Sequence, residues 1–268
     1  MSGDPSRQFG PILVVAPHQD DAALSCSALI EAPGPVDVLT VFTGLPETPR
    51  RGWWDVKTGF DGSHESVPAR NEEERRALEP CVRHLELLGL LEDQHLDGER
   101  TATDAETLAS KVRAWAAEEG PIATVALPAC AGWRPGLIRR QLVRRGLLTQ
   151  PGPRPHPGHE YVRDVVLDAL SPADGQLLLY EELPYRWGGP ADAEAERVGA
   201  VRGVRAELVT LPVNREAKAA RISLYTSQVP HLSTARGHVD DPSVLPADER
   251  YWRLRKAPAV ATRTPTGP

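Results

Sequence analysis

The stretch ILVVAPHQDDAALSCSALIEAPGPVDVLTVF, residues 12–42, decides the fold class. It opens with an apolar run, residues 12–16, that is typical of a buried strand. Small and apolar residues over 21–31 predict a buried helix, which ends at Pro33-Gly34-Pro35. A second run of apolar and β-branched residues, 36–42, predicts another strand. A strand, a helix and a strand in about 30 residues form a βαβ unit, and this implies a parallel sheet.

The rest of the chain continues this alternation. Apolar patterning predicts strands over 122–127, 176–180 and 206–212, and helices over 69–88, 104–118, 159–170 and 215–228. We therefore expect one α/β domain over residues 1–268, Rossmann-like, with a mostly parallel sheet and helices on both faces. Residues 44–68, rich in Pro, Gly and aromatic residues, predict a long substrate-facing loop. Residues 256–268 predict a flexible tail.

Composition narrows the class of protein. Apolar residues make up 40% of the 268 residues, and the net charge is −6, which argues against nucleic acid or an anionic membrane as the main partner. No apolar run approaches the roughly 20 residues of a membrane span, and the polar N-terminus predicts no signal peptide. Cys26, Cys81 and Cys130 are odd in number and widely spaced, so we expect no disulfide framework and a reducing cytoplasm. A homo-oligomer is left open.

The first strand leads directly into chemistry-bearing residues, His18-Gln19-Asp20-Asp21. In an open α/β sheet, ligands bind beyond the carboxyl ends of the strands. His and Asp there can hold a divalent metal, and a spare carboxylate beside a metal-bound water is a natural general base. The alternative is that one Asp caps the following helix and His18 is a polar loop residue.

A second cluster, His156-Pro157-Gly158-His159, precedes a predicted helix. Parallel strands would bring its imidazoles to the same edge as His18. Together the two clusters offer two His and one Asp for a metal, with one Asp and one His left over. Three protein ligands and an open position for water is the catalytic zinc pattern. The alternative is a pair of surface histidines in a Pro-rich loop.

Other candidates lie outside these clusters. Trp53 and Trp54 could form a platform for a sugar ring, although exposed aromatic residues more often anchor loops. One carboxylate of Glu181-Glu182, after a predicted strand, could reach the site; the alternative is a solvated strand end. Neither a dinucleotide fingerprint nor a P-loop motif is present, so nucleotide cofactors are not supported.

The two clusters make the chain resemble the PIG-L/LmbE-like zinc-dependent N-deacetylases. The first motif of that family is typically P-H-P-D-D-E and the second H-P-D-H. The resemblance extends over about residues 12–228. It includes Arg70 followed by Glu73, and a late set of residues typical of one branch, namely Lys218, Tyr225, Ser227 and Gln228.

The resemblance implies a role for each matched residue. His18, Asp21 and His159 are the expected ligands of zinc or another divalent transition metal (iron, cobalt or nickel). Asp20 is the expected general base acting on a zinc-bound water, and His156 is expected to stabilise or protonate the reacting centre. Arg70 is expected to contact substrate.

Three positions depart from the family motifs. Gln19 replaces a Pro, which changes loop stiffness, and Ala22 replaces a Glu, as it does in some relatives. Gly158 replaces the Asp of H-P-D-H, which in the family orients His156 or raises its pKa. A substitute carboxylate for His156 would have to come from elsewhere in the chain.

The predicted function is zinc-dependent removal of an acetyl group from an N-acetylated amino sugar or a glycosylated small molecule. The resemblance implies this substrate class, and the composition, typical of a GC-rich genome, fits natural-product assembly. Two alternatives stay open. One is a metal-dependent hydrolase of another amide or an ester. The other is a catalytically impaired homologue that binds metal or sugar, for which the loss of the acid at Gly158 would be the mark.

Overall fold

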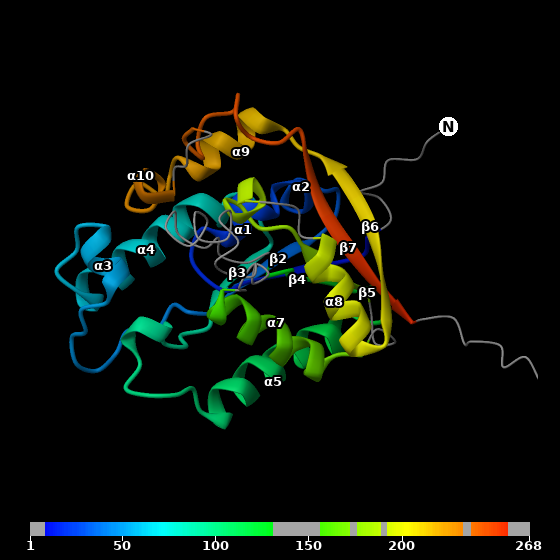
Figure 1. Cartoon of the computed structure of the whole chain (residues 1–268), viewed down its shortest axis with the longest axis horizontal. Coiled ribbons are helices and arrows are strands. Elements are labelled where there is room, and N and C mark those ends of the chain that lie inside the picture. Colours follow the sequence, from blue (N-terminus) through cyan, green and yellow to red (C-terminus); the bar gives the residue numbers. More distant parts are fainter. Residues whose placement is uncertain (1–8, 131–155, 172–175, 189–191, 233–236, 257–268) are drawn as a thin grey trace, which may run out of the picture.

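The strands of the described chain form one seven-stranded sheet in the order β3-β2-β1-β4-β5-β7-β6 (Figure 1). The computed structural model describes residues 9–130, 156–171, 176–188, 192–232 and 237–256. The strands are β1 Ile12–Ala16, β2 Val36–Thr40, β3 His84–Leu87, β4 Thr124–Pro128, β5 Gln176–Tyr180, β6 Val204–Pro212 and β7 Asp248–Lys256. The first five run parallel, and β7 pairs antiparallel with both β5 and β6. The predicted mostly parallel sheet is confirmed.

The strand order positions the site. From β1 the chain moves outward through β2 to β3, then returns to place β4 on the other side of β1. A crevice forms at such a reversal because the connections after β1 and β4 leave in opposite directions. The residues after β1 and those that follow β4 therefore meet beyond the same edge.

Helices cover both faces of the sheet, as the sequence predicts (Figure 1). The apolar residues of β1 alternate between two cores: Ile12, Val14 and Ala16 enter one, and Leu13 and Val15 enter the other. The first core includes residues of α1 Asp21–Ser25, α2 Ser27–Ile30, α4 Ser63–Leu78 and α9 Arg215–Ile222. The second includes residues of α5 Ala102–Glu119, α7 Pro157–Ala169 and α8 Asp192–Arg202. Successive side chains of β1 point to opposite faces of the sheet, and both faces are covered. All five residues of β1 are therefore buried, which explains its continuous apolar sequence.

Several predicted helices have different limits in the structure. The helix predicted over 21–31 is two short helices, α1 and α2, which meet at Cys26. The helix predicted over 69–88 begins earlier, at Ser63, and ends at Leu78; its last residues are instead the edge strand β3. The helix predicted over 215–228 ends at Ile222. For β3, pairing with β2 outweighs the local apolar spacing that suggested a helix.

The long loop predicted over 44–68 is partly helical. It contains α3 Trp53–Lys57 and the first turns of α4. Among the described residues, α8, α10 Val229–Leu232, β7 and the 3-10 helices η2 Asp93–His95 and η3 Tyr185–Gly188 had no sequence prediction either. β7 has the sequence DERYWRLRK and lies between β5 and β6. Its many charged residues do not give the apolar pattern from which a strand is predicted. The tail predicted from residue 256 begins at the last residue of β7, and residues 257–268 lie outside the described residues.

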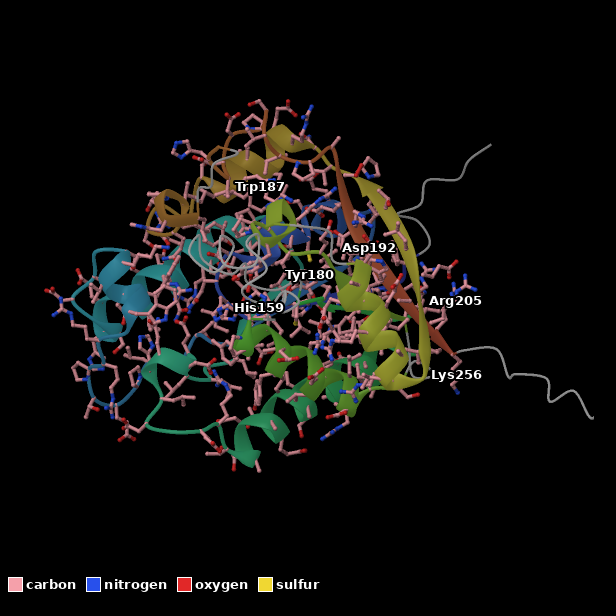
Figure 2. The ribbon with its side chains drawn as sticks, viewed as in Figure 1. His159, Tyr180, Trp187, Asp192, Arg205 and Lys256 are labelled. Carbon is pink, nitrogen blue, oxygen red and sulfur yellow. The ribbon has the colours of Figure 1, made fainter. Side chains whose placement is uncertain are left out.

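Figure 2 shows His159 in the interior of the molecule, whereas Arg205 and Lys256 lie at its periphery. Cys26, Cys81 and Cys130 are all unpaired. Within the described ranges, no helix is long and apolar enough to cross a membrane.

The carboxylate of Glu249 joins β7 to the helices of the first core. It accepts hydrogen bonds from Lys218 Nζ at 2.6 Å, from Tyr251 Oη at 2.5 Å and from the backbone N–H groups of Ser27 and Ala28. Lys218 and Glu249 are both buried. Removing one partner of a buried pair leaves the other charge uncompensated.

We predict that Glu249→Ala lowers the free energy of unfolding by about 3–5 kcal/mol, because the Lys218 charge loses its partner in the core. Urea denaturation followed by circular dichroism measures this. The matched control is Glu207→Ala on the neighbouring strand, where the Glu207–Arg255 pair is exposed and should contribute less than about 1 kcal/mol. Equal losses in the two variants would contradict the prediction.

Candidate active site

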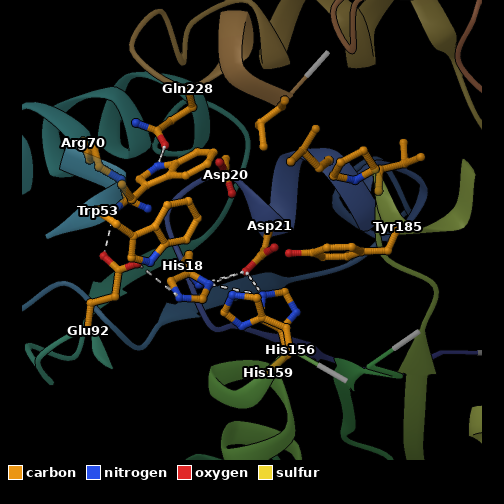
Figure 3. A pocket seen from close by; sticks show the side chains of 15 residues that line it. His18, Asp20, Asp21, Trp53, Arg70, Glu92, His156, His159, Tyr185 and Gln228 are labelled. Carbon is orange, nitrogen blue, oxygen red and sulfur yellow. Dashed lines mark hydrogen bonds and ion pairs between the residues drawn. The ribbon is translucent and has the colours of Figure 1, made fainter. Parts of the chain in front are cut away.

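Side chains that follow β1, β3 and β5, together with two histidines at the start of α7, line one pocket with about 530 Å³ of empty space, open solvent at its mouth included (Figure 3). His18, Asp20 and Asp21 follow β1, and Glu92 follows β3. His156 and His159 lie at the start of α7, the next described element after β4, and Tyr185 follows β5. The carboxyl ends of parallel strands share one edge, so residues far apart in sequence converge there.

His18, Asp21 and His159 form a compact triad of donor atoms. His18 Nδ1 lies 3.2 Å from His159 Nε2, and Asp21 Oδ2 lies 3.4 Å from each of these nitrogens. All three residues are buried. For four ligands placed tetrahedrally at about 2.0–2.1 Å from an ion, neighbouring ligand atoms are about 3.3–3.4 Å apart. The triad therefore has the shape of one face of a tetrahedral metal site.

Each imidazole of the triad has a carboxylate beside its other ring nitrogen. Glu182 Oε1 lies 3.2 Å from His159 Nδ1, and Glu92 Oε1 lies 3.7 Å from His18 Nε2. A carboxylate there favours the proton on that nitrogen and leaves the opposite lone pair for a metal. Asp21 Oδ2 is itself oriented by a hydrogen bond from the His18 backbone N–H at 2.8 Å. The three residues thus present donor atoms toward one point.

The charges of the site shift several pKa values. Burial alone would raise the pKa of Asp21, but the neighbouring His159 and His18 lower it to about 2. Burial would likewise lower the pKa of His159, but Asp21 and Glu182 raise it above its ordinary value. Burial and then the charge of Asp21 raise the pKa of Asp20 well above its usual range. The two adjacent aspartates are therefore electrostatically different.

Asp20 has an unusual backbone conformation. Its φ of 101° lies in the region that side chains rarely adopt. The backbone N–H of Asp20 donates to Glu74 Oε2 at 3.2 Å, and Glu74 also accepts from Thr40 and Tyr225. This buried network holds the turn that brings Asp20 into the pocket beside Asp21.

His156 packs against the triad and has no carboxylate partner among the described residues. Its ring centroid lies 4.7 Å from that of His159 and 5.2 Å from that of His18. Its Nδ1 atom is buried and has no hydrogen-bond partner among the described residues. A Cβ atom at Gly158 would lie 3.6 Å from that nitrogen and 3.0 Å from Phe42 Cε2. The position that carries the family's acid therefore does face His156, and in the described chain no other carboxylate takes its place.

Arg70, Trp53 and Trp54, the residues predicted to bind substrate, all line the pocket. Arg70 is buried and donates from one guanidinium nitrogen to Glu92 Oε2 at 3.0 Å. Trp54 donates from Nε1 to Gln228 Oε1 at 2.6 Å. Trp53 packs edge-on against Trp54, is 57% exposed and lines the pocket.

Sequence reasoning missed other residues of the site. Glu92 follows β3, which lies within a segment predicted as helix, so no sequence pattern indicates that Glu92 lies at the sheet edge. Tyr185 and Gln228 belong to no metal motif, although Gln228 is among the residues that carry the resemblance. For Glu181-Glu182 the structure selects the functional alternative: both are buried, and Glu182 contacts His159.

The family model described as PIG-L, GlcNAc-PI de-N-acetylase, matches residues 13–170. This is more than half of the chain, so the protein belongs to the PIG-L family, as the two sequence motifs predict. Comparison with curated protein sequences gives no match.

Solved structures share the fold. The zinc-inhibited form of teicoplanin deacetylase Orf2 matches with a TM-score of 0.67 and 20% identity, over 93% of this chain and 100% of that chain. The A40926 pseudoaglycone deacetylase Dbv21 matches with a TM-score of 0.64 and 20% identity, over 93% and 98%. The hydratase GalB from Pseudomonas putida matches with a TM-score of 0.51 and 14% identity, over 94% and 100%. At these low identities, the TM-scores establish a shared fold and nothing more. The same fold also supports chemistry other than deacetylation.

We predict that Glu182→Gln weakens metal binding by about 10–100-fold, because His159 loses the carboxylate that fixes its proton on Nδ1. Competition with a chromophoric chelator measures the affinity. Glu181→Gln is the matched control, since Glu181 instead pairs with Arg250 and Arg186. A Glu182→Gln protein that binds metal as tightly as the control would contradict this role.

Proposed function

We propose that this protein is a metal-dependent hydrolase that removes the acetyl group from an N-acetylated amino sugar carried on a small molecule. One observation carries the proposal: a triad with the spacing of a tetrahedral metal face lies beside a second aspartate, Asp20, in one pocket. Membership of a de-N-acetylase family supports the reaction class.

Zinc is the metal we propose. Two imidazoles and one carboxylate are a donor set that suits zinc, with a fourth position left for water or substrate. When bound, such a metal acts as a Lewis acid and lowers the pKa of a coordinated water. His18, Asp21 and His159 would hold it, and the outer carboxylates of Glu92 and Glu182 would fix the two imidazole rings.

The remaining residues of the pocket would move protons and bind substrate. Asp20 takes the proton from the attacking water and passes it to the nitrogen of the leaving amine, so that acetate and a free amine result. His156, whose ring packs against those of His18 and His159, stabilises the reacting centre. Arg70, with one guanidinium nitrogen committed to Glu92, contacts the substrate with its remaining donors.

The mouth of the pocket supports a sugar conjugate as substrate. Trp53 and Trp54 present aromatic faces on which an apolar sugar face can stack. One of the solved structures with this fold is a deacetylase in complex with teicoplanin, with a TM-score of 0.62 and 20% identity. We propose a glycosylated natural product as the conjugate. The three unpaired cysteines support a reducing cytoplasm as its location.

We predict that Asp20→Asn lowers kcat for acetate release by about 10²–10⁴-fold while the metal content stays stoichiometric. Asn tolerates the left-handed backbone of residue 20, so the turn should persist. The assay is acetate and free-amine detection over a panel of N-acetylated sugar conjugates, with metal measured by plasma mass spectrometry. Asp21→Asn is the companion variant and should lose the metal.

The outcomes separate the alternatives. Turnover of esters or of amides with other acyl groups, without acetate release from the panel, would favour the other hydrolase. A protein that binds metal and sugar conjugate but releases no product would be the impaired homologue. Full activity in Asp20→Asn would refute the base assignment, and a wild-type protein without stoichiometric metal would refute the site as a whole.

We predict that Trp53→Ala raises KM for a sugar conjugate about 3–10-fold and leaves kcat nearly unchanged, because stacking at the mouth contributes equally to the ground state and the transition state. Steady-state kinetics measures both constants. Val56→Ala is the matched control: Val56 is also exposed on α3, but it does not line the pocket. A loss confined to kcat would place Trp53 in the chemistry instead.

A further inference from the structure

Tyr185 enters the pocket from an element that carries no metal motif. It begins the short 3-10 helix η3, Tyr185–Gly188, which follows β5. Its ring meets the ring of His159 edge-on at 5.8 Å between centroids and lies 6.4 Å from that of His156. Figure 3 shows the phenol pointing inward, with its hydroxyl toward the carboxylate of Asp21. The hydroxyl therefore approaches the triad from the β5 side, opposite to Glu92 and Trp53.

The hydroxyl of Tyr185 is a donor without a described acceptor. Within the described residues it makes no hydrogen bond, although it is an inward-facing group that lines the pocket. Trp54 donates to Gln228 and His159 lies beside Glu182, whereas Arg70 gives one guanidinium nitrogen to Glu92 and keeps its Nε–H without a described acceptor. A phenol with a pKa near 10 or higher keeps its proton at neutral pH and can donate.

Amide hydrolysis is accelerated by such a donor, in addition to any Lewis acid at the site. As the nucleophile attacks, the π electrons of the carbonyl move onto its oxygen, and a preorganised donor stabilises that charge. The family motif assigns this task to His156 with the help of an acid. Here Gly158 supplies no acid, and Nδ1 of His156 is left without a partner among the described residues.

We propose that Tyr185 is a further catalytic residue whose hydroxyl donates a hydrogen bond to the carbonyl oxygen of the scissile amide. The inference rests on the proposed amide hydrolysis at this site. Tyr185 keeps its proton throughout, and the proton gained by the leaving amine still comes through Asp20. The hydrogen bond strengthens as charge develops on the oxygen, so it acts on kcat more than on KM.

The test compares Tyr185→Phe with the zinc-loaded wild-type protein. We expect kcat for acetate release to fall about 10²-fold, with KM within about threefold and zinc content unchanged. Tyr161→Phe is the matched control. It also removes a phenol hydroxyl that has no hydrogen-bond partner in the described structure, but Tyr161 does not line the pocket.

A binding measurement makes the test independent of turnover. Acetohydroxamate, a metal-directed mimic of the acetyl group, is titrated calorimetrically into the zinc-loaded proteins. We expect Tyr185→Phe to weaken its binding about tenfold or more, as loss of a hydrogen bond to a charged oxygen should, and Tyr161→Phe to leave it unchanged. Equal affinity in Tyr185→Phe and wild type overturns the proposal, as does failure of the zinc-loaded wild type to bind the hydroxamate.

The two readouts separate this inference from the proposed function. If the wild type releases no acetate but Tyr185→Phe weakens hydroxamate binding, the deacetylase assignment fails and the donor role of Tyr185 stands. If the wild type releases acetate and Tyr185→Phe matches it in both measurements, the deacetylase stands and the role of Tyr185 is refuted.

Discussion

The rest of the site depends on a concentration of buried negative charge at the carboxyl edge of the parallel strands. Asp20, Asp21, Glu74, Glu92 and Glu182 are all carboxyl groups with little or no exposure to water, and several face the same two imidazoles. Carboxylates in such a space raise one another's pKa unless cations lie among them. Arg70 is one such cation, and it helps to hold the pKa of Glu92 at about 2 although burial opposes this. A divalent metal at the triad would be a second cation among these carboxylates. The charge of the site and the geometry of its donor atoms therefore both favour a metal ion.

This centre was predictable where its residues follow strongly patterned elements. The apolar run of β1 is buried on both faces, so its end at Ala16 could be read directly, and His18 and Asp21 follow at once. His159 is assigned through the resemblance, because His156-Pro157-Gly158-His159 matches the family's second motif, and the structure places it in the first turn of the amphipathic helix α7. Glu92 could not be assigned, because β3 is a four-residue edge strand, only half-buried, whose pattern merges with the preceding helix. β7 was missed for a related reason: partner strands on both sides bury charged residues that on their own predict an exposed segment.

Trp53 and Trp54 could be named as candidates from the sequence, but their position relative to His18 could not. Trp53 and Trp54 fall in a segment with no helical periodicity, and only tertiary contacts give it shape. The carboxylate of Asp55 accepts from Ser66 and lies 2.8 Å from the buried His95 ring, and Gln94 accepts from the backbone of Trp54 while donating to Glu92. The same short segment, residues 92–95, therefore contacts both His18 and α3. These contacts of residues 92–95 fix the position of α3, which carries Trp53 and Trp54, relative to His18.

Gly158 stands where the family motif has an acid, and the ring of Phe42 lies against this position. A Cβ atom there would press on Phe42, whose ring packs against His18 at 5.3 Å and lies 3.9 Å below the Arg100 guanidinium. His159 does not depend on that position, because its outer carboxylate comes from Glu182, which follows β5. The triad therefore does not need the acid that the family motif places beside His156. The absence of that acid at Gly158 leaves the contacts of His18, Asp21 and His159 intact. Among the described residues His156 has no orienting acid, and the phenol ring of Tyr185 lies 6.4 Å from its ring between centroids. In the proposed hydrolysis, Tyr185 would therefore take a larger share in stabilising the charge on the carbonyl oxygen.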